Sequence, residues 1–277
     1  MSRSAGGGPQ AQRDELATLI EASRSRLDVV LALLVAAAAA WFLTAVRMAG
    51  MDAGPGTSLQ ALGWFTGVWA VMMAAMMIPS LAPTAAVYAT LARRREPSGW
   101  LLFSGGYLLV WSAAGVVAYG VFELGRDLFA GALAWHAGGR WLTAGVLAFA
   151  AVYQLTPMKV ACLARCRSPR QLLGGRWLEG RAGALAMGVR SGRWCIGCSW
   201  ALMVALFALG VMSLIWMALV AALVIFEKLG PWPRAASVGT AVLLVALAVG
   251  IVTSPHDVPG LVVPGSHAAM HAMKAMG

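Results

Sequence analysis

Four cysteines, arranged as two close pairs, are the residues of this sequence best suited to chemistry. Cys162 and Cys166 are four residues apart in ACLARCRSP, and Cys195 and Cys198 are three residues apart in WCIGCSW. Both spacings place two sulfur atoms on one face of a helix or turn, where they can bind one ion. Thiolates bind soft metals and also react in thiol–disulfide exchange. The pairs therefore indicate metal binding or redox chemistry.

Cysteines in membrane helices are often small apolar packing residues without chemistry. The distribution of the cysteines argues against that interpretation, because all four of them fall in the two pairs. Packing residues scattered along a chain rarely give such a pattern. We therefore treat the four cysteines as candidate metal ligands.

The segment WAVMMAAMMIPS, which starts at Trp69, is a second candidate site. At 100° per residue its four methionines occupy one face of a helix: Met72, Met73, Met76 and Met77. Pro79 removes the hydrogen bond to the Ala75 carbonyl and kinks this helix. Thioethers beside a kink suit the passage of a soft cation such as Cu(I). Methionine is also an ordinary core residue, so plain packing remains the alternative.

The end of the chain, HAAMHAMKAM, holds a third group of soft ligands. Its metal candidates are His267, Met270, His271 and Met273. Imidazole together with thioether suits copper. Several prolines follow Val252, so we expect residues 253–277 to form a flexible tail without a continuous helix. Terminal segments tolerate most residue types, so plain sequence drift is the alternative explanation.

The composition places the chain in a membrane. Of its residues 60% are hydrophobic and only 12% are charged, whereas soluble domains carry about a quarter charged residues. The net charge of +10 accompanies long apolar runs and no basic–aromatic module, so it reports membrane topology and we expect no nucleic-acid partner. The sequence shows no phosphate-binding loop and no catalytic triad order, so we expect no enzyme.

Apolar runs bounded by charge, Pro or Gly predict an all-α bundle of about seven transmembrane helices. The runs are Leu27–Val46, Trp64–Leu91, Trp100–Phe122, Gly139–Pro157, Trp194–Gly210, Met212–Phe226 and Arg234–Val252. The fifth and sixth runs are short and follow each other almost directly in the sequence, so they predict a tight helical hairpin. Glu227 and Lys228 end the sixth run, where charges usually anchor a helix at the membrane interface.

The distribution of Lys and Arg predicts the orientation. With the N-terminus in the cytoplasm, only four of the 21 fall outside: Arg47, Arg126, Arg140 and Lys274. Basic segments stay in the cytoplasm, so we predict the N-terminus inside and the C-terminus outside a bacterial inner membrane. Residues 1–26 are then a cytoplasmic tail with one short helix near Asp14–Ser25. Residues 27–252 are the transmembrane domain, and 158–193 form its basic cytoplasmic loop.

Three ordered motifs resemble a known family. They are WAVMMAAMMIPS, YQLTPMKVACLARCRSP, and CIGCSWALMVALFALGVMSLIWM followed by FEK. They are similar to domain of unknown function 2182, described as predicted metal-binding integral membrane proteins, over about Trp64 to Val252. The resemblance implies a polytopic inner-membrane protein that binds metal. Where that family often has a further cysteine after CxxC, this chain has Ser199, so a four-sulfur site would use the four cysteines alone.

These features together favour the handling or transport of a soft metal ion, with copper(I) favoured over zinc. The outer His/Met tail would collect the ion, the methionine face would pass it, and the inner thiolates would receive it. Ligand softness rises inward along this route. The expected partners are the lipid bilayer and a periplasmic or cytoplasmic metal-carrier protein.

Two alternatives remain open from the sequence. A thiol–disulfide electron carrier would use the same two pairs, but it needs sulfurs reachable from both faces of the membrane, and the predicted topology puts both pairs on one side. A membrane scaffold would use the four thiolates to hold a structural zinc ion. The identity of the bound metal separates the scaffold from the copper hypothesis.

Overall fold

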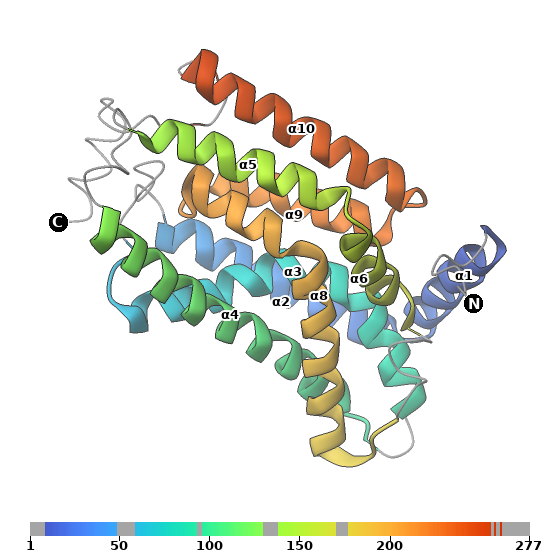
Figure 1. Cartoon of the computed structure of the whole chain (residues 1–277). Coiled ribbons are helices and arrows are strands. Elements are labelled where there is room, and N and C mark those ends of the chain that lie inside the picture. Colours follow the sequence, from blue (N-terminus) through green and yellow to red (C-terminus); the bar gives the residue numbers. More distant parts are fainter. Residues whose placement is uncertain are drawn as a thin grey trace.

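The computed structural model of the chain describes residues 9–48, 59–92, 96–129, 138–169, 177–255, 258 and 261, and within these it contains helices and no strand. The all-α prediction is therefore confirmed for this part of the chain (Figure 1). The helices are α1 (Pro9–Ser25), α2 (Leu27–Met48), α3 (Leu62–Ala92), α4 (Gly99–Phe129), α5 (Arg140–Gln154), α6 (Pro157–Arg167), α8 (Gly180–Gly210), α9 (Leu214–Leu229) and α10 (Pro233–Thr253).

Five of the described helices, α2, α3, α4, α8 and α10, are long and apolar enough to cross a membrane. The count rises to six if α5 and α6, which meet at a 65° bend, form one broken span. Helix α9 has 16 residues and is shorter than the other candidates. Each of the seven predicted apolar runs corresponds to helix in this structure. Large apolar side chains are exposed along α2, α4 and α10, as contact with lipid requires.

The segment 158–193, predicted as a basic loop, is largely helical. Helix α6 forms the beginning of this segment, and the first half of α8 forms its end. The helix that contains the fifth predicted run therefore starts at Gly180 and not at Trp194. Arginine is a good helix former, and a basic segment is therefore free to extend an apolar helix. The N-terminal helix starts at Pro9, earlier than the predicted Asp14. His267, Met270, His271 and Met273 lie outside the described residues.

Glycines bring α4 and α8 into close contact. A Cβ atom on Gly188 would lie 1.9 Å from the Phe103 carbonyl oxygen, and one on Gly106 would lie 2.2 Å from the Leu185 carbonyl oxygen. Small residues at a membrane helix crossing let the two backbones approach in this way. The crossing sets the register of α8 against α4. Cys195 lies two turns beyond Gly188 on α8, and this register places it beside Tyr107 of α4.

The predicted hairpin between the fifth and sixth runs is present as α8 and α9. Gly210 ends α8 with φ +120°, a conformation that favours glycine, and three residues lead to Leu214. The Ser213 amide donates to the Gly210 carbonyl at 3.1 Å. Helix α9 then runs back along α8, so its C-terminal end lies level with the Cys195 turn of α8.

The break between α5 and α6 turns the chain toward α8. Thr156 caps α6, and its Oγ1 accepts a hydrogen bond from the Lys159 amide at 3.3 Å. Pro157 occupies the first turn of α6, where its missing N–H is not needed. The 65° bend lays α6 across α8 and directs one face of α6, which carries Cys162 and Cys166, at that helix.

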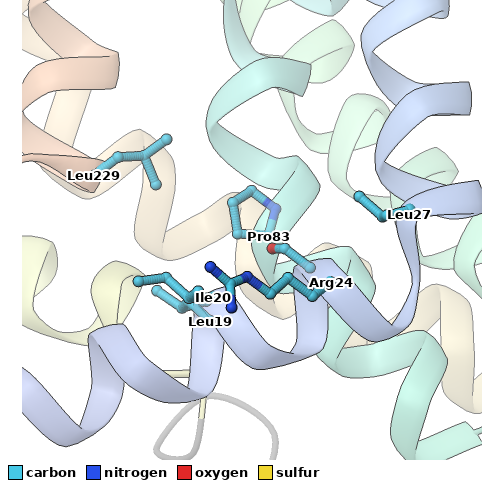
Figure 2. A pocket seen from close by; sticks show the side chains of 7 residues that line it. Leu19, Ile20, Arg24, Leu27, Pro83 and Leu229 are labelled. Carbon is cyan, nitrogen blue, oxygen red and sulfur yellow. The ribbon is translucent and has the colours of Figure 1, made fainter.

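Helix α1 packs against α3 and α2 and borders a shallow groove (Figure 2). The groove has a volume of about 300 Å³ and is lined by Leu19, Ile20, Ser23, Arg24, Leu27, Pro83 and Leu229. Its lining is almost wholly apolar apart from Arg24 and Ser23. None of the four cysteines lines it, so the groove is separate from the sulfur-bearing region.

Candidate metal centre

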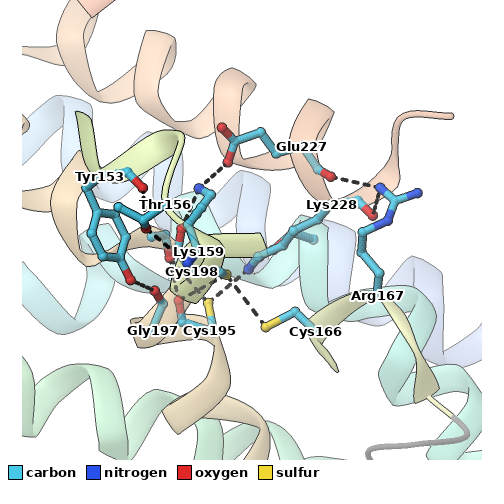
Figure 3. Close-up of polar contacts among 12 residues, drawn as sticks. Tyr153, Thr156, Lys159, Cys166, Arg167, Cys195, Gly197, Cys198, Glu227 and Lys228 are labelled. Atoms are coloured by element: carbon cyan, nitrogen blue, oxygen red, sulfur yellow. Dashed lines mark hydrogen bonds and ion pairs between the residues drawn. The ribbon is translucent and has the colours of Figure 1, made fainter. Parts of the chain in front are cut away.

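The two cysteine pairs meet where α6 crosses α8. The Sγ atoms of Cys166 and Cys198 are 3.6 Å apart (Figure 3). Cys162 lies against the neighbouring turn of α8, because a Cβ atom on Gly197 would be 2.7 Å from the Cys162 Sγ. All four cysteines are free thiols. Residues distant in sequence thus form one sulfur-rich contact between two helices.

The fourth sulfur faces a different set of groups. Cys195 Sγ lies 2.9 Å from the Tyr107 hydroxyl and accepts a hydrogen bond from the Lys228 ammonium, also at 2.9 Å. Ser199, where the resembling family often has a cysteine, places its Oγ 3.6 Å from the same sulfur. In the described part of the chain no three His, Cys, Asp or Glu side chains converge as a metal-binding group. The sulfurs therefore form one pair, Cys166 with Cys198, and two flanking thiols.

Exposure distinguishes the four sulfurs. Cys162, Cys195 and Cys198 are buried, with exposed fractions of 9%, 1% and 2%, whereas Cys166 is only partly buried. Leu163 and Trp194 pack against the cluster. Cys166 is therefore the sulfur that a partner or a solute reaches first.

A buried ion pair lies behind the sulfur contact. Lys159 and Glu227 have exposed fractions of 0% and 2%, and the Lys159 Nζ donates to Glu227 Oε2 at 2.6 Å. The same ammonium donates to the Cys198 carbonyl. Glu227 Oε1 has no hydrogen-bond partner among the described groups. Lys159 thus joins α6, α8 and α9 at the point where the sulfurs meet.

Lys228 is the second buried ammonium of the centre. Its Nζ donates to Ser80 Oγ on α3 at 3.1 Å as well as to the Cys195 sulfur. The sequence suggested that Glu227 and Lys228 anchor a helix at the interface; in the structure both side chains are buried within the protein, with exposed fractions of 2% and 8%. The Lys159 and Glu227 charges cancel, so Lys228 carries a net positive charge that the other described groups of this network do not balance.

Three further hydrogen bonds hold α5, α6, α8 and α9 together around the sulfur contact. The Arg167 Nη1 donates to the carbonyl oxygens of Glu227 and Lys228, at 2.8 Å each. A cation at the last carbonyls of a helix satisfies acceptors that have no partner within the helix. The Tyr153 hydroxyl donates to the Gly197 carbonyl at 2.5 Å. The last residue of α6 and a residue of α5 are thereby fixed to α9 and α8.

The four methionines of the second candidate site are fully buried. Met72, Met73, Met76 and Met77 have exposed fractions of 1% or less. Met76 and Met77 precede Ser80 by four and three residues, so they lie one helical turn from the residue that contacts Lys228. Both Pro79 and Pro83 lie inside α3. The methionine face therefore leads along α3 toward the Lys228 side of the sulfur centre.

Comparison with known proteins shows a family match. The sequence profile of the PpoB2 family, described as a copper chaperone, matches residues 66–251. The matched range contains the methionine face, the four cysteines and the buried Lys159, Glu227 and Lys228. No curated protein and no solved structure matches the chain. The likeness to domain of unknown function 2182 remains a resemblance of motifs.

Proposed function

We propose that this chain, which belongs to the PpoB2 family of copper chaperones, binds Cu(I) between Cys166 and Cys198 and transfers it at a membrane. The observation that carries the proposal is the 3.6 Å separation of these two sulfurs. Two thiolates that bind one metal at about 2.3 Å with the tetrahedral angle of zinc lie about 3.8 Å apart, and they lie somewhat farther apart in the near-linear geometry of a two-coordinate Cu(I) ion. The pair needs little movement to bind one ion, and Cys166 gives that ion access.

The buried charges favour a monovalent metal. Lys228 is a buried cation without an ion-pair partner in the described network, and buried charges are costly unless they are paired. Cu(I) with two thiolates forms a complex with one negative charge, which balances this ammonium. Zinc with the same two thiolates forms a neutral complex and leaves the ammonium unbalanced. The network therefore supports copper(I) over zinc as the cargo.

The membrane arrangement that we propose has seven spans. They are the five long helices, the bent α5–α6 pair and α9, with the N-terminus in the cytoplasm of a bacterial cell and the C-terminus outside the inner membrane. Helix α8, with 31 residues, is roughly 46 Å long, and it exceeds a hydrocarbon core of about 30 Å. Its first turns then extend into the cytoplasm, and the sulfur centre lies near the cytoplasmic interface.

The transport route that we propose joins three groups of soft ligands. The outer tail, with His267, Met270, His271 and Met273, collects copper. The methionine face of α3 passes the ion inward, and the thiols at the α6–α8 contact exchange it with a carrier. The position of Ser80, one turn beyond Met76 and in contact with Lys228, supports a connection between the methionines and the sulfurs.

Copper binding by purified protein tests the proposal. We expect the wild-type protein in nanodiscs to bind Cu(I) under anaerobic conditions, and the Cys166→Ser/Cys198→Ser variant to lose most of that affinity. Leu163→Ala is the matched control, because it alters packing in the same cluster without removing a sulfur. Equal copper content and affinity in wild type and the double variant would contradict the proposal. Zinc that leaves only on unfolding would instead support a structural site.

The same sulfur pair also supports thiol–disulfide exchange as a second candidate function. Cys166 would attack the disulfide of a partner, and Cys198 would then displace the partner thiolate. The partner disulfide is reduced to a dithiol while the Cys166–Cys198 dithiol becomes a disulfide. Differential alkylation in cells separates the two functions, because a carrier shows a fraction of both cysteines as disulfide and a copper chaperone keeps them reduced.

A further inference from the structure

We infer that the copper species docking at Cys166 is an anionic Cu(I)–thiolate complex, held by the guanidinium groups of Arg165, Arg190 and Arg193. The inference rests on the proposed function and names its substrate class. A free cation is the wrong substrate for this surface, because the accessible sulfur lies beside concentrated positive charge. An anionic complex of the same metal is attracted by that charge.

The three arginines, which we call the basic rim, lie on the helices that carry the sulfurs. Arg165 is the residue before Cys166, and its guanidinium carbon lies 4.1 Å from the centre of the Trp194 ring. Trp194 itself packs against the sulfur cluster. Arg190 precedes Trp194 by one turn on the same face of α8, and Arg193 precedes it directly. Stacking on Trp194 thus fixes the Arg165 charge beside the cluster.

The positive charge of the rim is not neutralised within the part of the chain that the structure describes. Arg165 and Arg193 are exposed and Arg190 is half-buried. The ion pairs found there join Arg26 to Asp28 and Lys159 to Glu227, and none involves a rim arginine. Clustered charges of one sign steer ions of opposite sign and repel those of the same sign. The rim therefore selects by charge before any sulfur is exchanged.

Transfer from such a complex is a ligand exchange that leaves copper as Cu(I). The Cys166 sulfur binds the copper and displaces one donor thiolate, and Cys198 then displaces the second. The protons of the two cysteine thiols end on the two released donor thiols. The starting complex and the product each hold one Cu(I) and two thiolates, so no electron is transferred and the charge at the metal is unchanged. The product then lies in the network of Lys228, which balances that charge.

Two sources offer this chemistry: a small anionic thiol and an acidic carrier protein with a metal-binding pair of cysteines. Four probes separate donor charge from donor size. Cu(I)–glutathione is anionic and Cu(I)–cysteamine is cationic, although both present copper between two thiolates. A CxxC peptide flanked by glutamates, and its counterpart flanked by lysines, test the protein-like donor.

The experiment measures the second-order rate of copper transfer to full-length protein in nanodiscs of zwitterionic lipid. The test variant is Arg165→Gln/Arg190→Gln/Arg193→Gln, and the same three positions as Lys restore the charge. Arg181→Gln is the control, because Arg181 is exposed on α8 but lies about 26 Å from Cys198 along the helix, beyond the screening length at physiological salt. Equilibrium Cu(I) affinity is measured for every variant, so that loss of the site itself is detected.

We expect the Gln variant to receive copper from the anionic donors about tenfold more slowly and from the cationic donors no more slowly. We also expect the wild-type rate with anionic donors to fall as salt rises, and the Lys variant to recover the rate. A rim effect confined to glutathione identifies a small thiol, and one confined to the acidic peptide identifies a carrier protein.

Equal rates for wild type and the Gln variant with all four donors would overturn the inference. A variant that slows anionic and cationic donors alike would also overturn it. If wild type binds no copper from any donor, the proposed function fails; if it binds copper without regard to donor charge, the proposed function stands and the inference about the rim fails.

Discussion

Replacing Lys159 by methionine tests the buried charge layer beneath the sulfurs. Met has a similar length and fills the volume, but it leaves Glu227 without its only ion-pair partner among the described groups. The side chains of the pair are exposed by 1% and 3% and their charged atoms are 2.6 Å apart. Breaking a buried pair by removing one partner costs about 3–5 kcal/mol. We expect at least this loss, because Glu227 Oε1 already has no hydrogen-bond partner and the Cys198 carbonyl loses the Lys159 donor.

The assay is reversible unfolding of the protein in mixed micelles, followed by tryptophan fluorescence. The double variant Lys159→Met/Glu227→Met removes both charges, and we expect it to recover most of the lost stability, because replacing a buried pair by apolar residues is often neutral. Arg181→Met is the control for loss of an exposed charge. A loss under about 1 kcal/mol in the single variant, or no recovery in the double variant, would refute the buried and ionised state of this pair.

Two other substitutions test the centre itself. Gly197→Ala places a methyl group 2.7 Å from the Cys162 sulfur. Such overpacking costs about 1–3 kcal/mol and should move α6 away from α8. We expect Cu(I) affinity, measured by competition with a chelator, to fall about tenfold. Gly239→Ala, with open space around it, should leave that affinity unchanged, and equal affinities in all three proteins would contradict the close contact. Lys228→Met removes the cation that contacts Cys195, so we expect Cu(I) affinity to fall about tenfold and zinc affinity to change less. An equal loss for both metals in the same titration would remove the charge argument for copper.

The helical architecture was predictable because the signals are local. Long runs rich in Ala and Leu, bounded by Pro, Gly and charge, correspond to helices in the structure, and Gly210 marks the hairpin between α8 and α9. The helices within segment 158–193 were not predicted, because hydropathy detects apolar runs and not helices. Its arginines are compatible with a helix that extends beyond the apolar part, and Thr156–Pro157 is a capping signal that was present in the sequence.

The candidate site was predictable only as two separate pairs of sulfurs. The contact between the two pairs depends on the bend between α5 and α6. The sequence between Cys166 and Cys195 does not predict this contact. The contact between Lys228 and Cys195 could have been predicted, because Lys228 follows the α8–α9 turn by about as many residues as Cys195 precedes it. An antiparallel hairpin then places the two residues side by side. Ionisable residues that belong to an apolar helix are candidate functional residues, and this rule would have selected Glu227 and Lys228.

Charge conservation connects the rim, the sulfur pair and Lys228 into one mechanism. An anionic complex approaches the rim, exchanges its thiolates for those of Cys166 and Cys198, and remains an anion of the same charge. A bare Cu(I) ion that approached Cys166 from outside the protein would face the arginines of the rim and be repelled. A complex that already holds two thiolates is attracted by the same arginines. The arginines and Lys228 therefore interact with the charge of the copper complex, whereas the cysteines bind the metal itself. Variants of the arginines should slow the approach of the complex, and variants of the cysteines should prevent the binding of copper.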